Sequence, residues 1–393
     1  MTIILLIIIY LAFISLGLPD SLFGVAWPVI HIEFGIDQGF ASLMTIIIGC
    51  GTIWTSIFAG KAIRKFGTGI ITAFSVCFTA VGLIGISFSQ NVWVMIVFCI
   101  ILGIGAGAID AALNDYVAKH YKPQHMNWLH CFWGIGVTTS PIIMSRFLKN
   151  ADWRGGYQTI AIMQSVLVVI MFASLPLWKK VTNSFKLSES ALNVVPTSET
   201  IKSKINPIKI KGVTLSMAGM AFYCGLEMTL GTWGASMLIE TKGIAPSTAA
   251  LWIALYYGGI TVGRGLSGFL AMKLSDNTLI KGGLFAIIFG IVLLLLPFGQ
   301  ILTLIGLMLI GLGCAPIFPC TIHATATRFG FEYSADLVGY QMAAAYIGSG
   351  ILQPLVGFIS SRTTFLIMPY ILLGFVLIQL LFFTLLKRKL AKV

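Results

Sequence analysis

Hydrophobic residues recur along this chain in long runs, and short polar stretches separate them. A helix needs about twenty apolar residues to cross a bilayer, and most runs are close to that length. The pattern predicts twelve transmembrane helices, at residues 3–30, 41–60, 70–89, 92–118, 127–148, 158–178, 212–239, 248–271, 282–298, 301–326, 336–358 and 365–386.

The longest polar stretch, residues 179–211, holds seven lysines and two glutamates among Ser, Thr and Pro, which is typical of a linker. We therefore predict an all-α membrane protein with twelve transmembrane helices in two six-helix, pseudo-symmetric halves. Residues 1–178 form the N-terminal half, 179–211 a basic cytoplasmic linker, and 212–393 the C-terminal half with a short basic tail.

Composition supports a membrane protein and excludes a soluble one. Hydrophobic residues make up 58% of the chain and charged residues only 10%, whereas soluble proteins carry about a quarter charged residues. The net charge of +12 does not predict nucleic-acid binding, because the basic residues fall between apolar runs instead of forming one patch. The lipid bilayer is the expected surrounding.

Basic residues also predict the orientation. Of the 25 Lys and Arg residues, nineteen fall on the side that holds both termini, four on the other side, and two within helices. The positive-inside rule then places both termini in the cytoplasm, and we expect a multi-pass protein of the plasma membrane. The first apolar run lacks a basic leader and is too long for a signal peptide, so we interpret it as an uncleaved helix.

Cysteine spacing gives no sign of a metal site or disulfide framework. The seven cysteines lie in apolar segments and form no Cys-x-x-Cys pair. We also find no nucleotide-binding loop and no nucleophile–base arrangement, so an enzyme is not expected.

An internal repeat relates the two halves. Gly17-Leu18 matches Gly225-Leu226, Gly51 matches Gly259, and the segment 102–109 resembles 310–317, always at a separation of 208 residues. Lys65 and Gly60 match Lys273 and Gly268 at the same separation. Parallel repeats of this kind are typical of transporters with a site between the halves, near the middle of the bilayer.

The layout and one loop resemble the major facilitator superfamily. The loop signature of that family is glycine, three residues, aspartate, a base, one residue and glycine. This chain keeps Gly60, Lys65 and Gly67 but has Arg64 where the family usually has Asp. The resemblance implies alternating access, a monomer, no cofactor, and a gating role for Gly60, Lys65 and Gly67.

Shorter motifs resemble the fucose-permease-like and sodium–glucose-transporter-like sugar carriers of that superfamily. They are Ile109-Asp110-Ala-Ala-Leu-Asn114 in the fourth helix, Gly17-Leu-Pro-Asp20 in the first, Leu129-His130-Cys-Phe132 and Ala315-Pro-Ile-Phe-Pro319. This resemblance implies a sugar-like small-molecule substrate.

Asp20 and Asp110 are the predicted proton-coupling residues. Each is an acid in an apolar span, where charge costs about 2.5–3.5 kcal/mol unless it faces a cavity or a partner. Asp20 is suited to binding a proton or cation or to accepting a hydroxyl hydrogen, and these functions are favoured over a structural acid that pairs with a freed backbone N–H. For Asp110 we expect H+ as the coupling ion, with Na+ as the alternative.

Predicted substrate-binding residues surround these acids in the sequence. Asn114 lies one turn from Asp110, Trp27 shares the face of Asp20, and His130 lies in the fifth helix. Asn114 is equally suited to joining helices by hydrogen bonds, and His130 to packing.

In the second half, Glu227 is central in the seventh helix, with Tyr223 one turn away and Trp233 further along. An acid beside aromatic rings suits a sugar, and equally an organic cation. Arg264 is expected to control gating or to neutralise an intramembrane acid, and Gln341 is a weaker binding candidate.

Two transport functions compete, and the first is proton-coupled uptake of a monosaccharide-like solute. The alternative is a proton-coupled exporter of drug-like or cationic compounds. Exporters of the superfamily carry a Gly-Pro-rich motif in helix five, which here reads Gly136-Val-Thr-Thr-Ser140-Pro141 and lacks the second glycine, so import is favoured. A passive facilitator or lipid scramblase would not need the acids, and a channel would need a ring of selectivity residues.

Overall fold

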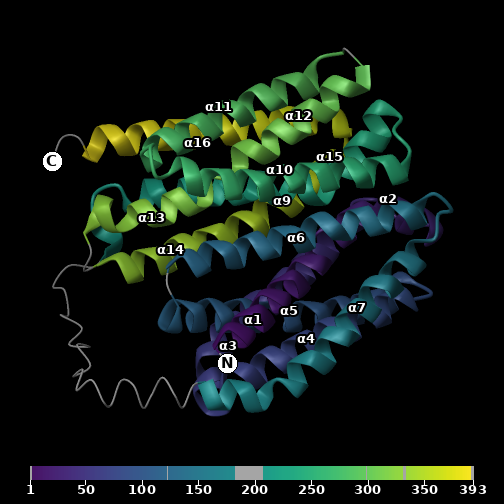
Figure 1. Ribbon diagram of the computed structural model, residues 1–393. Helices are drawn as coiled ribbons and strands as arrows, with labels where there is room; N and C mark the ends of the chain where they lie inside the picture. The colour runs from purple at the N-terminus through teal and green to yellow at the C-terminus, as the bar shows by residue number, and fades with distance from the viewer. Residues whose placement is uncertain (1, 122, 182–206, 298, 331–332, 391–393) are drawn as a thin grey trace. The chain divides into compact units, whose positions relative to one another are not determined.

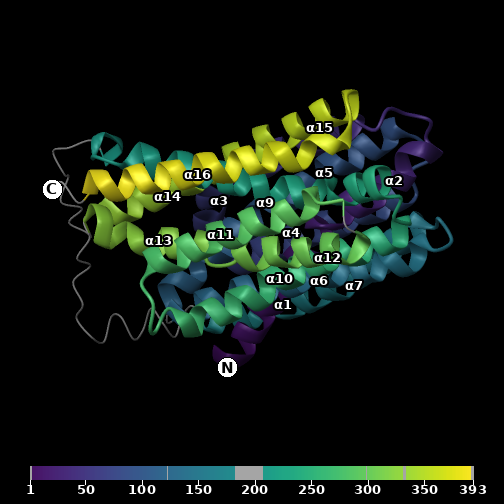
Figure 2. The same ribbon diagram turned by 90° about the horizontal axis from the view of Figure 1, so that it is seen from above.

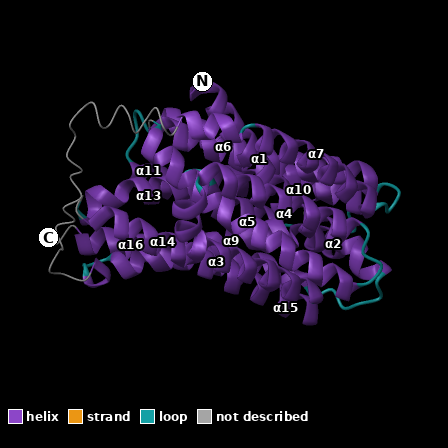
Figure 3. Ribbon diagram, turned by 90° about the horizontal axis from the view of Figure 1, so that it is seen from below, coloured by secondary structure: helices purple, strands orange, loops and turns teal. Residues whose placement is uncertain are grey.

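The computed structural model describes residues 2–121, 123–181, 207–297, 299–330 and 333–390. Within these ranges the regular secondary structure is helical (Figure 3). Contacts divide the chain into unit 1, Met1–Ile36 with Met44–Glu199, and unit 2, Asp37–Leu43 with Thr200–Val393. Most of the predicted linker lies outside the described residues, so the predicted boundaries 178 and 212 stay predictions.

Unit 1 is built from helices that pack side by side. They are α1 (Thr2–Asp20), α2 (Leu22–Glu33), most of α3 (Phe40–Phe66), α4 (Thr68–Ser87), α5 (Val92–His120), α6 (Pro123–Leu148) and α7 (Trp153–Ala173). In this unit α1 runs along α6, and α4 packs against both α5 and α7 (Figure 1).

The helices of unit 2 also pack side by side. Its helices are α9 (Val213–Lys242), α10 (Pro246–Leu270), α11 (Asp276–Leu295), α12 (Gly299–Cys314), α13 (Ile317–Phe329), α14 (Ser334–Ile347), a π-helical turn (Gly348–Leu352), α15 (Gln353–Arg362) and α16 (Met368–Leu390), with 3₁₀ turns at Pro207–Lys209 and Phe365–Ile367. Helix α16 packs along α9, and α12 packs against both α10 and α11 (Figure 2).

Each of the twelve predicted segments lies on helical structure, and the predicted all-α membrane fold is confirmed. Within the described residues, nine spans are long and apolar enough to cross a membrane, and ten if the bent pair Phe40–Ser56 and Phe58–Phe66 is one span. Helices α6 and α10 complete the twelve. Their hydropathy is lower because α6 carries His130 and Thr138 and α10 carries Arg264.

Several predicted helices are interrupted in the structure, the sixth of them at Ser174, directly after the end of α7. The first bends where α1 ends at Asp20 and α2 begins at Leu22, directly after Pro19, because proline donates no hydrogen bond to the preceding turn. The hydroxyl of Ser21 at the bend donates to the carbonyl oxygen of Val137, at 2.8 Å. The tenth helix breaks before Ile317, after Ala315-Pro316, and the eleventh contains the π-helical turn.

Two helices begin earlier than predicted, because polar residues that suggested a loop are caps. The Asp152 side chain accepts a hydrogen bond from the Gly155 N–H at 2.9 Å and starts α7. The Ser275 hydroxyl accepts from the Thr278 N–H at 3.3 Å, so α11 begins at Asp276 instead of residue 282.

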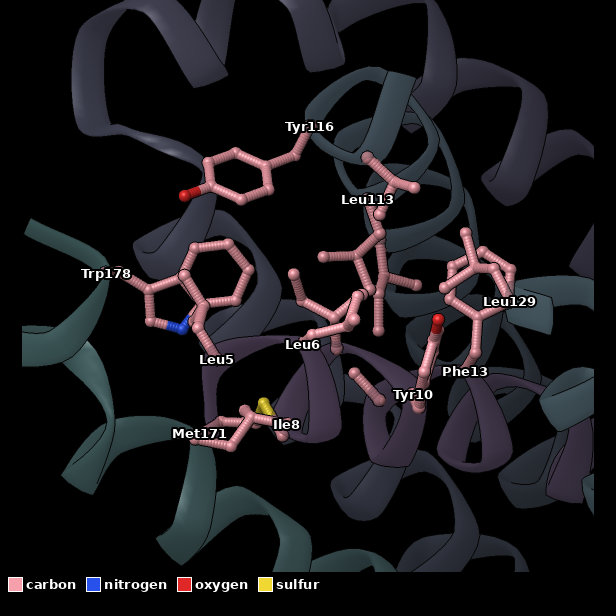
Figure 4. Packing of buried hydrophobic residues seen from close by; sticks show 14 of the residues in the cluster. Leu5, Leu6, Ile8, Tyr10, Phe13, Leu113, Tyr116, Leu129, Met171 and Trp178 are labelled. Atoms are coloured by element: carbon pink, nitrogen blue, oxygen red, sulfur yellow. The ribbon is translucent and has the colours of Figure 1, made fainter. Parts of the chain in front are cut away.

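A cluster of buried apolar side chains joins the helices of unit 1. Leu5, Leu6 and Phe13 of α1 lie together with Leu113 of α5 and Leu129 of α6 (Figure 4). This packing holds α1, α5 and α6 together, and these are the helices that carry the acids and His130 of the predicted site.

The 208-residue repeat recurs in the helix contacts. A Cβ on Gly105 would lie 2.8 Å from the carbonyl oxygen of Ser75, and one on Gly313 would lie 2.6 Å from that of Gly283. Both residues of the second contact are 208 positions after those of the first.

A second pair of contacts follows the same rule. A Cβ on Gly82 would lie 2.9 Å from Cβ of Leu102, and one on Gly290 would lie 2.7 Å from a side-chain carbon of Ile310. The separation is again 208 for both partners. The repeat in the sequence therefore corresponds to a repeat in helix packing, in which backbones approach too closely for any side chain.

The closest of these contacts gives a stability prediction. A Cβ on Gly311 would overlap the carbonyl oxygen of Tyr256, and one on Gly103 would overlap that of Ile48, its counterpart in the repeat. We expect Gly103→Ala and Gly311→Ala each to destabilise the protein by about 1–3 kcal/mol, the usual cost of overpacking. Thermal unfolding in detergent measures it.

The matched control is Gly265→Ala in α10, because no atom lies within 4 Å of a Cβ there. Its melting temperature should be unchanged or slightly higher, since alanine favours the helix. Equal melting temperatures for Gly265→Ala and Gly311→Ala would contradict the packing argument.

Candidate functional site

Asp20 lies at the bend between α1 and α2, and a tryptophan of α6 holds it. The Trp133 indole Nε1–H donates to Asp20 Oδ2 at 2.8 Å. The two helices meet through glycines: a Cβ on Gly17 would lie 3.0 Å from the Val137 nitrogen, and one on Gly136 would lie 3.0 Å from Gly17 Cα. This close approach brings the Trp133 indole within hydrogen-bond distance of the Asp20 carboxylate. The Asp20 side chain is otherwise exposed.

Asp110 and Asn114 of α5 form a second polar pair. The Asn114 Nδ2–H donates to Asp110 Oδ1 at 2.8 Å and to the Asp110 carbonyl oxygen at 3.0 Å, and both residues are half-buried. The prediction that they share a helix face is confirmed by this geometry.

Gly103 and Gly107, which precede Asp110, allow helix α3 to pack closely against α5. The Thr52 hydroxyl donates to the Gly103 carbonyl oxygen at 3.3 Å, and the Ser56 hydroxyl donates to that of Gly107 at 3.0 Å. In this structure the glycines therefore admit helix α3, which fixes the position of α5 and of the acid that follows.

His130 lies on α6, about one turn before Trp133, the residue that donates to Asp20. It is half-buried, and its ring meets the edge of Phe13 with centroids 5.8 Å apart. This contact supports the packing interpretation that the sequence left open, while the substrate-binding role stays a prediction.

In unit 2, Glu227 of α9 pairs with Arg264 of α10. The Arg264 Nη2 lies 3.5 Å from Glu227 Oε1, and only 12% and 4% of the two side chains are exposed. Tyr256 lies on the same face of α10, two turns before Arg264, and its hydroxyl donates to the Glu227 carbonyl oxygen at 3.1 Å. Arg264 therefore pairs with an intramembrane acid, and its gating role stays a prediction.

Four predicted binding residues use their side chains for packing within their own unit. Trp27 stacks near Phe23 and His31 in unit 1, and Trp233 packs on Phe365 in unit 2. Both indoles are almost completely buried. Their substrate-binding role stays a prediction.

Tyr223 and Gln341 are buried in the same way. The Tyr223 hydroxyl donates to the Cys314 carbonyl oxygen at 3.0 Å, at the break between α12 and α13. The Gln341 amide accepts from the Thr325 hydroxyl at 2.9 Å and donates to Ser216 Oγ at 2.8 Å. These bonds satisfy the polar atoms within unit 2.

The predicted gating loop joins α3 to α4. Gly67 has φ +87°, which favours glycine, and it starts α4 at Thr68. The Lys65 ammonium lies 5.2 Å from the Phe66 ring centroid. A Cβ on Gly60 would meet Arg64 Nη1 at 3.6 Å, which is ordinary contact, so Gly60 is not required by packing here.

Sequence reasoning missed two partners. Trp133 was not linked to Asp20, because the link depends on how α1 crosses α6. Tyr256 was not considered, although its spacing of eight residues from Arg264 places both on one helix face.

Comparisons with known proteins agree with this architecture. Residues 9–351 match the sequence model of the Major Facilitator Superfamily. The chain is 20% identical over 361 residues to the glucose/mannose transporter GlcP of Bacillus subtilis (strain 168), covering 91% of this chain and 88% of that protein. It is 23% identical to the human sodium-dependent glucose transporter 1, covering 87% and 72%.

A third relative differs in length. The yeast (Saccharomyces cerevisiae) bypass of stop codon protein 6 is 23% identical over 67% of this chain, and the match spans only 56% of the yeast protein.

Solved structures share the fold. The D-xylose-proton symporter has a TM-score of 0.76 at 14% identity, covering 96% of both chains, and a mutant of the peptide transporter POT has a TM-score of 0.75 at 14% identity, covering 98% of this chain and 94% of the other. With a family match over most of its length, this chain belongs to the Major Facilitator Superfamily and is a multi-pass secondary transporter, not an enzyme.

Proposed function

We propose that this protein takes up a monosaccharide-like solute across the plasma membrane, coupled to protons, by alternating access as a monomer with both termini in the cytoplasm. The observation that carries the proposal is that each intramembrane acid of unit 1 has its own hydrogen-bond donor, Trp133 for Asp20 and Asn114 for Asp110. A carboxylate in an apolar span favours its neutral form unless hydrogen bonds stabilise the charge, so such an acid can take up and release a proton.

The partners of these acids suit coupling. Trp133 donates to Asp20 and Asn114 donates to Asp110, so each carboxylate has a hydrogen-bond donor when ionised. Protonation weakens these charge-assisted bonds. A proton then changes the relative stability of the outward-facing and inward-facing states, which is the requirement for coupling.

A sugar-like substrate is supported by the relatives and by the chemistry of unit 1. Two of the relatives described above are named for glucose transport and a similar structure for xylose transport. Asn114 and His130 supply donors and acceptors suited to hydroxyl groups. Glu227 would bind a substrate hydroxyl only after its pairing with Arg264 loosens, which makes this pair our candidate gate.

An exporter of cationic compounds would need an acidic side chain whose charge is not already paired, so that it can bind the cation. In unit 2 the Glu227 charge is compensated by Arg264 at 3.5 Å, which favours a neutral substrate over a cation. Sodium is the alternative coupling ion.

The proposal predicts proton entry driven by sugar. In proteoliposomes holding a pH-sensitive dye, adding a hexose or deoxyhexose outside should acidify the lumen without an imposed gradient, because solute entry draws protons with it. Organic cations tested in parallel should give no signal.

Three results would overturn the proposal. Proton release on addition of cations alone would identify an exporter. Acidification without any solute would identify a leak, and sugar uptake that requires sodium and leaves the luminal pH unchanged would identify a sodium symporter.

A further inference from the structure

Arg154, the second residue of α7, joins three segments at one end of unit 1. Its guanidinium forms an ion pair with Glu33 at the end of α2, and its Nη2–H donates at 2.9 Å to the carbonyl oxygen of Ser89, which lies between α4 and α5. The guanidinium also lies over the Trp153 ring, 4.3 Å from its centroid. One side chain therefore connects the end of α2, the turn after α4 and the start of α7.

A buried tryptophan holds the second oxygen of the same carboxylate. The Trp153 indole Nε1–H donates to Glu33 Oε2 at 2.6 Å, and Trp153 is completely buried. The Phe34 ring, next to Glu33, meets Trp153 edge-on with centroids 5.9 Å apart. Hydrogen bonds to an ionised carboxylate are stronger than those between neutral groups. Glu33 is thus bonded through both oxygens, and its position on α7 is specified more closely than by an ion pair alone.

The internal repeat gives unit 2 no counterpart of this cluster. Arg362 lies 208 residues after Arg154, but Thr241 occupies the position that corresponds to Glu33. Arg362 is exposed, lies 5.7 Å from the Phe358 ring centroid, and forms no ion pair with any residue that the structure describes. The cluster is therefore a feature of unit 1 and does not follow from the helix packing that the halves share.

Helix α2 is also held at its start. The Ser21 hydroxyl donates to the Val137 carbonyl oxygen of α6 at 2.8 Å. Between the two ends, Leu22, Val25 and Ile30 are completely buried, and α2 packs against both α6 and α7. A bend after a proline acts as a hinge only if the segment beyond it is free to turn. Here α2 is fixed at both ends.

We propose that Arg154 and Glu33 are positioning residues that hold α2 on α7 throughout the transport cycle. The bend at Asp20 then stays fixed, and α2 moves with unit 1 as one body instead of acting as a separate gate. This inference rests on the proposed alternating access and deepens it. Because Glu33 ends the first span, the proposed orientation places the cluster on the outer side of the membrane.

Hydrogen exchange of the purified protein tests the contact without a transport assay. Arg154→Gln should speed exchange of the α2 amides by about two- to fivefold, as expected for the loss of a partly exposed ion pair. Glu33→Gln should act in the same direction, and the double variant should exchange no faster than Arg154→Gln, because the same contact is lost. Arg362→Gln is the matched control, since it removes an arginine at the repeat-related position, and it should leave α2 unchanged.

A reversible metal bridge tests whether α2 and α7 stay together during transport. Glu33→His combined with Arg154→His places two zinc ligands at the contact, and the described part of the parent has no group of side chains suited to a metal ion. Zinc should raise the melting temperature of the double variant but not that of the parent. Transport by the double variant should be at least as fast with zinc as after its removal by a chelator.

Three results would overturn the proposal. The first is α2 exchange in Arg154→Gln that equals the parent's. The second is reversible inhibition by zinc in the double variant but in neither single variant, because α2 would then have to leave α7. The third is the absence of a zinc-dependent melting shift, because the two positions would then not be held together. A parent that moves no tested sugar would reject the proposed substrate and leave the exchange result standing.

Discussion

Asp110→Asn is expected to abolish uphill accumulation of solute while exchange of solute across the membrane continues. An imposed gradient of two pH units supplies about 2.7 kcal/mol per proton, enough for about a hundredfold accumulation by a one-to-one symporter. A protein without the coupling acid cannot use this free energy, so the ratio of internal to external solute should fall to about one.

The structure indicates that this substitution is mild. Asn114 donates to Asp110 Oδ1, and the amide oxygen of an asparagine at position 110 can accept the same bond. Folding should therefore be preserved, and the lost function should lie in coupling.

The measurement compares accumulation of labelled hexose with counterflow in the same proteoliposomes. Glu240→Gln is the matched control, because Glu240 is an exposed carboxylate at the end of α9. It should accumulate solute like the parent. If Asp110→Asn still concentrates the solute, the proton-coupling role of Asp110 is wrong.

Arg264→Gln is expected to have the largest effect on stability. Glu227 is only 3% exposed, and removing its partner leaves a buried charge uncompensated. Breaking a buried pair in this way costs about 3–5 kcal/mol. We expect a strongly lowered melting temperature and poor yield of folded protein.

The double variant separates structure from gating. Glu227→Gln with Arg264→Gln removes both charges, and two amides of similar size should restore most of the stability lost in the single variant. If the pair controls gating, transport should stay defective although the double variant folds. Full transport by the double variant would show that the pair is only structural, and Arg362→Gln serves as the control for loss of an exposed arginine.

The helices were predictable because a bilayer imposes one requirement on every span. Runs near twenty apolar residues must be helical to satisfy their backbone groups, so the twelve segments followed from hydropathy alone. Positions of bends and caps were less predictable. Asp and Ser are common in loops as well as at helix caps. Only the hydrogen bonds that Asp152 and Ser275 accept from the Gly155 and Thr278 N–H groups identify these two residues as helix starts.

Contacts between site residues on the same helix were predictable from the sequence, and contacts between helices were not. Asp110 and Asn114 share a face because of the helical period, and their hydrogen bond confirms that. The partner of Asp20 was not predictable, because Trp133 is 113 residues away and reaches it only through the Gly17–Gly136 crossing. Likewise, the spacing of Tyr223 from Glu227 suggested a binding residue. In the structure the Tyr223 hydroxyl donates a hydrogen bond to the backbone oxygen of Cys314.

The sequence by itself determined the membrane-spanning class, the helical segments, the internal repeat and the acids, since each follows from local hydropathy, spacing or residue type. Only the tertiary structure decided which arginine neutralises Glu227, which indole holds Asp20, and that Arg154 joins Glu33 to Ser89. Those pairings depend on how far apart helix backbones lie and how they cross. Close approach at glycines determines that geometry, and no local pattern along the chain encodes it.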